Sequence, residues 1–277
     1  MNNKRIFLTF LLGAFMAAAV VYSQENTVDR ATVPLSDPSK PAVVQVSTFR
    51  GSISVTGYNG SDVIVEAQVR SKMIERERTS EKARGMKLIP ISAAGLSVTE
   101  ESNEVSIKVE SLKHAVDLTV QVPHTCSLKV KAFNEGDIDV KNVAGELEIT
   151  NHNGGISLTG ISGNALANTF NGELLVTFNK IDPNKPMSFS TFNGDVDVTF
   201  PGEIKADVKM KSEMGDIYSD FDILIVQQQT QKQEQEKDEE GRYRISFDKT
   251  VYGKINGGGP EYTFKNYNGD IFIRKAK

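Results

Sequence analysis

The stretch Phe192-Asn193-Gly194-Asp195-Val196 decides the fold, because variants of it return along the chain. The closest copies are Phe170-Asn171-Gly172-Glu173-Leu174, His152-Asn153-Gly154-Gly155-Ile156, Tyr267-Asn268-Gly269-Asp270-Ile271 and the one-residue-longer Phe133-Asn134-Glu135-Gly136-Asp137-Ile138. Weaker copies begin at Phe49, Tyr58 and Glu213. A turn phrase that recurs between short alternating runs is typical of an architecture of stacked repeats.

Apolar and polar residues alternate on both sides of each copy, which is the period of a strand with one face turned inward. We call the turn at the glycine of each copy the corner. Before the corner, the inward positions hold two apolar residues and then a small or polar one. These sets are Leu147/Ile149/Asn151, Ala165/Ala167/Thr169, Met187/Phe189/Thr191, Val208/Met210/Ser212 and Tyr262/Phe264/Asn266. We expect the polar members to form a ladder along the long axis.

The spacing of the glycines predicts an all-β β-solenoid (β-helix) with about two strands in each coil of 18–22 residues. Asn-Gly between alternating runs is also the strongest short signal for a β-hairpin, so a tandem hairpin meander is the alternative. The near-identical copies favour the solenoid, in which equivalent residues of successive coils stack on one another, with neighbouring strands about 4.8 Å apart.

The N-terminal segment 1–23 has the pattern of a secretory signal peptide. Lys4 and Arg5 precede the uncharged apolar run 6–22, and Val21 and Ser23 are small residues placed for a cut before Gln24. An uncleaved membrane anchor is the alternative, because the run is close to the minimum length for spanning a bilayer. Cleavage leaves no integral membrane span, and it takes the formal charge from −4 to −6.

The rest of the chain, 24–277, is expected to form a single domain with two insertions. Residues 72–86 alternate in charge and predict a minor exposed helix or loop. Residues 227–242 are rich in Gln, Glu and Lys and predict a polar, mobile insertion.

Composition excludes several classes of function. A mildly acidic chain is a poor candidate for binding nucleic acid, which needs clustered Lys and Arg. The single cysteine, Cys126, excludes an internal disulfide and thiolate metal clusters, and we expect it to be buried. His114, His124 and His152 have no metal-ligand spacing, and no Gly-x-Ser-x-Gly motif accompanies them. The sequence therefore predicts no catalytic, cofactor or metal site.

Two repeated features are the remaining candidates for a site. Acids follow the corner glycine, and stacked they could bind Ca²⁺ or supply the carboxylates of a glycan lyase or hydrolase. This acid column comprises Asp137, Glu173, Asp195, Asp216 and Asp270. Aromatic residues precede the glycine, and they either form a ligand-binding row or only pack on one another. The proposed ligand face is Phe133, Phe170, Phe192 and Tyr267, and Phe49 and Tyr58 belong to the same pattern.

The segment Val116-Asp117-Leu118-Thr119-Val120-Gln121-Val122-Pro123, followed by Leu128-Lys129-Val130 and the Asn-Gly-Asp-Ile/Val repeats, resembles a known bacterial family. This exported family of unknown function is catalogued as "putative adhesin" and is related in style to autotransporter-head adhesin-like domains. The resemblance spans about residues 40–277. It implies a right-handed parallel β-solenoid, and it transfers no catalytic motif.

Together these features predict a non-enzymatic exported scaffold that presents a repetitive face to a surface glycan or an envelope protein. The expected location is the periplasm, the outer-membrane surface or the extracellular space. The alternatives are a glycan-active β-helix enzyme that uses the exposed carboxylates and a purely structural or regulatory envelope protein. The sequence leaves the ligand and the oligomeric state open.

Overall fold

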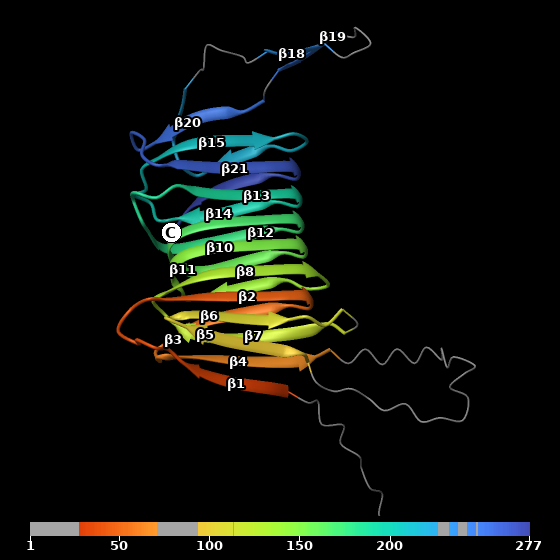
Figure 1. The fold of residues 1–277 in the computed structure, drawn as a ribbon. Coiled ribbons are helices and arrows are strands. Elements are labelled where there is room, and N and C mark those ends of the chain that lie inside the picture. The colour runs from red at the N-terminus through yellow and green to blue at the C-terminus, as the bar shows by residue number, and fades with distance from the viewer. Residues whose placement is uncertain (1–27, 71–93, 113, 227–232, 238–242, 248) are drawn as a thin grey trace, which may run out of the picture.

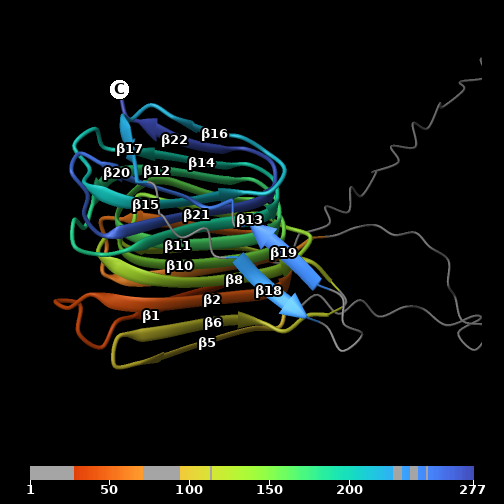
Figure 2. The same ribbon diagram turned by 90° about the horizontal axis from the view of Figure 1, so that it is seen from above.

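The computed structural model describes residues 28–70, 94–112, 114–226, 233–237, 243–247 and 249–277. In this part of the chain the protein is all-β and contains no helix. Twenty strands form one sheet of mixed orientation, which curls back on itself into a nearly closed, barrel-like body (Figures 1 and 2). The predicted helix or loop at 72–86 lies outside the described residues.

The sheet has two long sides that face each other across the core. We call the first the column side. Its strands, in spatial order, are β5 (Leu96–Glu101), β6 (Glu104–Val109), β2 (Ala42–Arg50), β8 (Cys126–Asn134), β10 (Ala144–Asn153), the second half of β11 (Ile156–Asn171), β13 (Met187–Asn193), β21 (Glu261–Asn268), β15 (Ala206–Ser212), β20 (Val251–Ile255) and β17 (Ile223–Ile225).

The opposite side carries the strands that follow the corners. In spatial order they are β1 (Val28–Pro34), β4 (Asp62–Val69), β7 (Val116–Pro123), β3 (Ile53–Tyr58), β9 (Ile138–Lys141), the first half of β11, β12 (Leu174–Ile181), β14 (Val196–Phe200), β22 (Ile271–Lys275) and β16 (Ile217–Ser219). A strand on each side and the corner between them make one layer. A separate hairpin pairs β18 (Gln233–Lys237) with β19 (Tyr243–Phe247), so part of the predicted insertion 227–242 is a strand.

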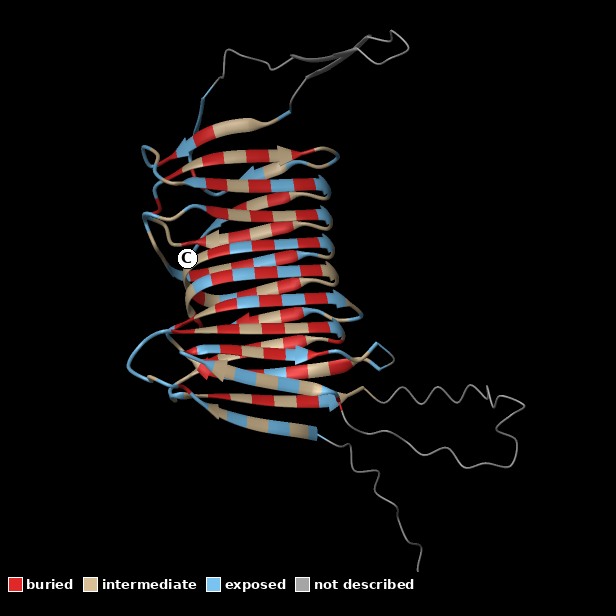
Figure 3. Ribbon diagram, in the orientation of Figure 1, coloured by how far each residue is buried: buried red, intermediate tan, exposed pale blue. Residues whose placement is uncertain are grey.

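The core lies between the two sides and is built by the alternation in the sequence. Buried residues alternate with less buried ones along the strands in the middle of the body (Figure 3). The inward positions of the repeat are buried, and equivalent residues pair across layers, as Leu147 does with Leu128 and Ala165. Phe189 and Phe264 stack in the core with centroids 5.5 Å apart. Apolar burial of this extent is the main favourable term in folding.

The prediction of a right-handed parallel β-solenoid with successive coils was wrong, because the strands differ in orientation. Several pairings at both ends of the body are antiparallel: β1–β4, β4–β7, β5–β6, β15–β20 and β17–β20. The β5–β6 hairpin turns at Ser102 and Asn103, whose φ angles are 54° and 66°. Positive φ at both central residues matches the twist of a two-residue hairpin, so this turn forces an antiparallel pair.

The order of the layers also departs from the sequence. The N-terminal layer β2–β3 lies between β6–β7 and β8–β9, and the C-terminal layer β21–β22 lies between β13–β14 and β15–β16. Local alternation specifies a strand-corner-strand unit, but it does not say which unit pairs with which. The sequence repeat was therefore correct about the unit and wrong about the succession of units.

Candidate binding face

A column of stacked aromatic rings crosses six neighbouring strands on the column side. In spatial order its members are Phe49, Phe133, His152, Phe170, Phe192 and Tyr267. Neighbouring centroids lie between 4.5 and 5.2 Å apart, and neighbouring planes differ by 16° or less. The five Phe and Tyr residues are 39–44% exposed. We call this feature the aromatic column. It contains all four residues of the predicted ligand face.

The corner glycines hold the column in register. Gly194 has φ +135°, and its N–H donates to the carbonyl of Asn268 in the next layer at 2.9 Å. A Cβ at Gly194 would lie 2.3 Å from the carbonyl oxygen of Gly172. The layers thus approach closely at the corner because a side chain is missing there. This close approach places each ring directly over the next.

An asparagine ladder runs beside the rings. Each side chain donates from Nδ2 to Oδ1 of its neighbour, at 2.6 Å from Asn153 to Asn134 and at 2.7 Å from Asn171 to Asn153 and from Asn193 to Asn171. Asn268 continues the ladder to Asn193 at 3.5 Å. The three inner members, Asn153, Asn171 and Asn193, each donate to one neighbour and accept from the other, which fixes their side-chain orientation next to the aromatic column.

The small polar residues predicted to point inward are buried, and they satisfy the corners rather than one another. Thr169 donates to the carbonyl of Gly154 at 2.8 Å, and Thr191 donates to that of Gly172 at 2.9 Å. Equivalent bonds to corner glycine carbonyls come from Asn151 (3.0 Å), Asn266 (2.6 Å) and Ser212 (3.2 Å). A buried carbonyl without a partner costs free energy, so these bonds stabilise the turns.

Stacking determines which part of each ring a ligand can reach. A ring inside the column, such as Phe170, has a neighbour on each face, His152 on one and Phe192 on the other. Its exposed part is therefore the ring edge. A sugar that packs on an aromatic face finds no free face inside the column. The positive end of an aromatic quadrupole lies at the edge, so the exposed strip favours electron-rich atoms.

A shallow groove of about 440 Å³ follows the aromatic column. It lies on the side of the residues that come two positions before each ring in its strand. One wall is formed by Phe133, His152 and Phe170, and polar side chains on the adjoining outward positions face it: Ser47, Lys131, Thr150 and Asn168. The groove crosses β2, β8, β10 and β11 and runs along the stack rather than along any strand. Its shape suits an extended ligand laid across the layers.

The predicted acid column lies beyond the corner, on the far side of the asparagine ladder. Three of its five carboxylates, those of Asp137, Asp195 and Asp270, accept a hydrogen bond from the backbone of a neighbouring layer. Oδ1 of Asp137 accepts from the N–H of Gly155 at 2.7 Å, and Oδ1 of Asp270 accepts from that of Asp216 at 2.9 Å. In the described part of the chain, no three His, Cys, Asp or Glu side chains are grouped as a metal site. The described residues therefore give no ligand cluster that would support the calcium hypothesis.

Cys126 and the histidines occupy separate places. Cys126 is buried, as expected, and burial raises its pKa to about 12, so the thiol is protonated at neutral pH. Nδ1 of His124 lies 2.7 Å from the carbonyl oxygen of Asn142, and His152 belongs to the aromatic column. His114 precedes β7.

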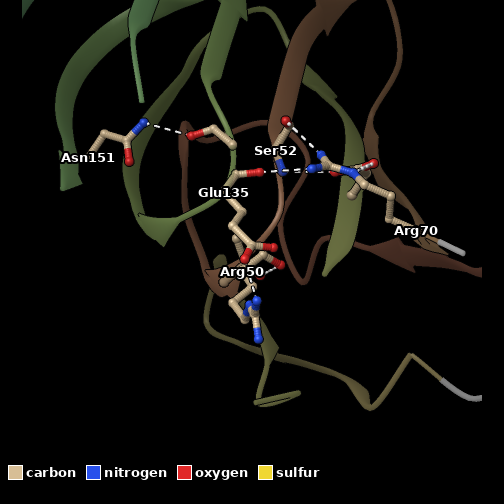
Figure 4. A network of polar contacts seen from close by, with 8 residues as sticks. Arg50, Ser52, Arg70, Glu135 and Asn151 are labelled. Atoms are coloured by element: carbon tan, nitrogen blue, oxygen red, sulfur yellow. Dashed lines mark hydrogen bonds and ion pairs between the residues drawn. The ribbon is translucent and has the colours of Figure 1, made fainter. Parts of the chain in front are cut away.

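An arginine network joins four segments at the widened corner of Glu135, where the N-terminal layer is inserted (Figure 4). Arg70 donates from Nε to Asp117 at 3.0 Å, from Nη2 to Ser52 Oγ at 3.2 Å and from Nη1 to the carbonyl of Glu135 at 2.8 Å. The hydrogen bond to Asp117 raises the pKa of Arg70 above its usual value. Arg50 pairs with the Glu135 carboxylate. Since Glu135 has φ 62°, the network supports a backbone conformation that few side chains adopt.

Sequence reasoning missed three features of the aromatic and histidine rings. His152 is a ring of the aromatic column, and its place in the repeated phrase was the signal. Tyr58 is not in the column; its hydroxyl donates to the carbonyl of Asp62 at 2.8 Å. On the opposite side, Phe272 stacks with Tyr218 at 5.2 Å, and the Arg274 guanidinium lies 5.0 Å from the Phe272 ring centroid. Phe272 and Tyr218 occupy outward positions, so their contact depends on the unexpected adjacency of β22 and β16.

The model of the family described as Toastrack DUF4097 matches residues 37–274. The chain belongs to this family. No curated protein matches it. Within the described residues, this Toastrack protein has no helix long and apolar enough to cross a membrane.

Solved structures similar to the Toastrack chain include a "putative cell adhesion protein" from Clostridium sporogenes, with 10% identity and a TM-score of 0.43 over 90% of this chain and 100% of that one. A "putative adhesin" from Bacteroides fragilis has 10% identity and a TM-score of 0.36 over 90% and 97%. A "putative lipid binding protein" from Parabacteroides distasonis has 11% identity and a TM-score of 0.24 over 91% and 98%.

Proposed function

We propose that this Toastrack protein is a non-enzymatic, exported binding scaffold of the bacterial envelope, and that the column side contacts a surface glycan or an envelope protein. The observation that carries the proposal is the aromatic column with its groove. Six rings are aligned across six strands, and their edges remain exposed. A contiguous apolar strip with a polar border is the kind of surface that proteins use for binding.

Export is proposed from the charge and hydropathy pattern of residues 1–23. The location outside the inner membrane, in the periplasm or on the cell surface, follows from that pattern. The expected kinship with autotransporter-head domains belongs with this proposal, since both would present a repetitive face to a partner.

A single exposed position gives the sharpest test. Thr150 lines the groove on β10, and Thr159 is an exposed threonine on the opposite half of β11. A glycan array and pull-downs from envelope fractions should identify ligands of the purified wild-type protein. Thr150→Glu should abolish most of that binding, and Thr159→Glu should retain it, while both variants keep the wild-type unfolding curve.

Absence of any ligand in both assays would contradict the proposal and favour a purely structural envelope role. Hydrolysis or elimination products from a bound glycan would contradict the non-enzymatic part and favour a glycan-active enzyme. Equal loss of binding in Thr150→Glu and Thr159→Glu would contradict the assignment of the binding surface to the column side.

A further inference from the structure

A single row of outward residues lines the groove next to the aromatic column and continues beyond both of its ends. The register places these residues on neighbouring strands, in the order Lys108, Ser47, Lys131, Thr150, Asn168, Ser190, Lys265 and Lys211. We call it the groove row. It contains four lysines and no acid, although the whole chain is acidic. The charge of this strip is therefore opposite to that of the protein.

Three of these lysines are available to a ligand. Lys108, Lys131 and Lys265 are exposed, and none of them has an ion-pair partner among the described residues. Lys131 and Lys265 are the two that flank the polar residues of the row. Lys211, by contrast, pairs with Glu213 at 2.8 Å. Glu148 is an acid on the same side, but it lies two residues before the groove row in its strand. It is therefore opposite Lys129 and not opposite Lys131. The groove row thus offers positive charge to a partner.

The chemistry between the two lysines limits the type of partner. Thr150, Asn168 and Ser190 lie between Lys131 and Lys265, and each can both donate and accept hydrogen bonds. Four layer steps of about 4.8 Å separate the lysines, which makes roughly 19 Å along the stack. The row therefore matches a polymer with many hydroxyl groups and widely spaced negative charges. The exposed ring edges beside it also favour electron-rich oxygen atoms.

Other anionic polymers fit less well. A nucleic-acid strand carries a phosphate about every 3.4 Å and would need a denser series of cations. A peptide strand binds best by adding to an open sheet edge. On the column side β8, β10 and β13 each pair with a strand on both sides, so their backbone groups are occupied.

We infer that the groove row binds an acidic polysaccharide that lies along the stack, with carboxylates at Lys131 and Lys265 and hydroxyl groups at Thr150, Asn168 and Ser190. The inference rests on the proposed binding function and names its ligand class. The aromatic column forms one wall of the site and contacts the chain through ring edges.

The test measures binding of the purified protein to polygalacturonate and to the same polymer with its carboxylates methyl-esterified. Wild type should bind the acidic form, and binding should weaken with added salt because screening reduces the attraction. Lys131→Gln combined with Lys265→Gln should weaken binding roughly tenfold, as expected for two exposed charge contacts. Lys141→Gln combined with Lys180→Gln changes the net charge equally on exposed positions of the opposite side and should leave binding unchanged.

Equal binding of the esterified and acidic polymers, or equal weakening by both double variants, would overturn the inference. Tighter binding of poly-glutamate than of polygalacturonate would also overturn it, in favour of an acidic protein partner. In each case, a ligand from the glycan array that Thr150→Glu rejects would leave the proposed binding function standing. If Thr150→Glu affects no ligand at all, both proposals fail together.

Discussion

Oδ1 of Asp195 accepts a hydrogen bond from the backbone N–H of Asp270 at 2.8 Å, although 75 residues separate the two in the chain. The bond joins the corner of the β13–β14 layer to that of the C-terminal layer β21–β22. It belongs to a series in which Asp270 in turn accepts from the backbone of Asp216. The acids after the corner glycine thus connect layers that are not neighbours in sequence.

Substitution of Asp195 tests this connection. Asp195→Ala leaves the Asp270 N–H without its acceptor and should reduce the free energy of unfolding by about 1–2 kcal/mol. Asp195→Asn keeps an oxygen in the same position and should lose less than half of that. Urea denaturation compares the two, and equal losses would show that charge rather than this bond matters.

The corner glycines should differ sharply in their tolerance of a methyl group. Gly194→Ala combines φ +135° with a Cβ 2.3 Å from a carbonyl oxygen, and should cost about 2–4 kcal/mol. Gly155 is the matched control, since its Cβ would lie 3.3 Å from its nearest neighbour, Glu173 O, and it does not have a positive φ. Gly155→Ala should cost less than about 1 kcal/mol. Thermal unfolding ranks the two variants, and a reversed order would refute this account of the corners.

Replacing the histidine of the aromatic column should stabilise the fold. His152 stacks on Phe133 at 4.7 Å and on Phe170 at 5.1 Å. Phenylalanine there adds apolar contact on both faces, so His152→Phe should raise the free energy of unfolding by about 0.5–1 kcal/mol. His114→Phe, at an exposed position outside the column, should not. Denaturation at neutral pH checks both, and destabilisation by His152→Phe would contradict the stacking argument.

The buried hydroxyl of Tyr262 should make stability fall in alkali. No described group bonds to it, and burial, with a smaller effect of Asp182, raises its pKa from 10.0 to about 12. Between these two values the unfolded chain loses this proton and the folded protein keeps it, so stability falls as pH rises. Tyr262→Phe should remove that part of the slope between pH 10 and 12, and be neutral or slightly stabilising at pH 7.

Unfolding curves at several alkaline pH values measure the Tyr262 effect. Cys126 acts in the same direction from pH 9.0 to about 12, so a residual slope should remain in Tyr262→Phe and become smaller when Cys126→Ala is added. A slope that Tyr262→Phe leaves unchanged would show that the hydroxyl finds a partner.

The arginine network should depend on geometry as well as on charge. Arg70 makes three separate contacts through a planar guanidinium. Arg70→Ala should reduce the free energy of unfolding by about 1–2 kcal/mol. Arg70→Lys should recover less than half of that loss, because an ammonium group cannot place donors in the planar geometry of a guanidinium. Arg30, paired with Glu66 at 3.4 Å on an exposed surface, is the control; Arg30→Ala should cost less than about 0.5 kcal/mol. Full recovery by lysine would assign the effect to charge alone.

Sequence alone was sufficient for the local unit. Alternation around residues such as Phe189 and Phe264 predicted which side chains are buried, and the phrase around Gly194 predicted the corners. The aromatic residues of the predicted ligand face share one position of the repeat, which is why they lie in one column; their role in binding stays a prediction.

The order and orientation of the layers could not be predicted in the same way. Thr191 pairs with Asn266 rather than with Ser212, the next polar member along the sequence, although both offer the same inward pattern. Near-identical units present interchangeable edges, so local pattern does not select a partner. The antiparallel ends depend on short turns such as Ser102-Asn103, which a search for repeats passes over. The groove row was missed since its members share no residue type.

The inserted position of β21–β22 has a consequence for biogenesis. A ribosome makes these residues after those of β15–β16, and yet they form an interior layer, with neighbours on both sides. A chain that is cut short therefore lacks a middle piece and not an end, and the two blocks it would have joined face each other across a gap. Completion of this body then requires β21 and β22, so copies that stop before residue 261 should be recognised and degraded by quality-control proteases.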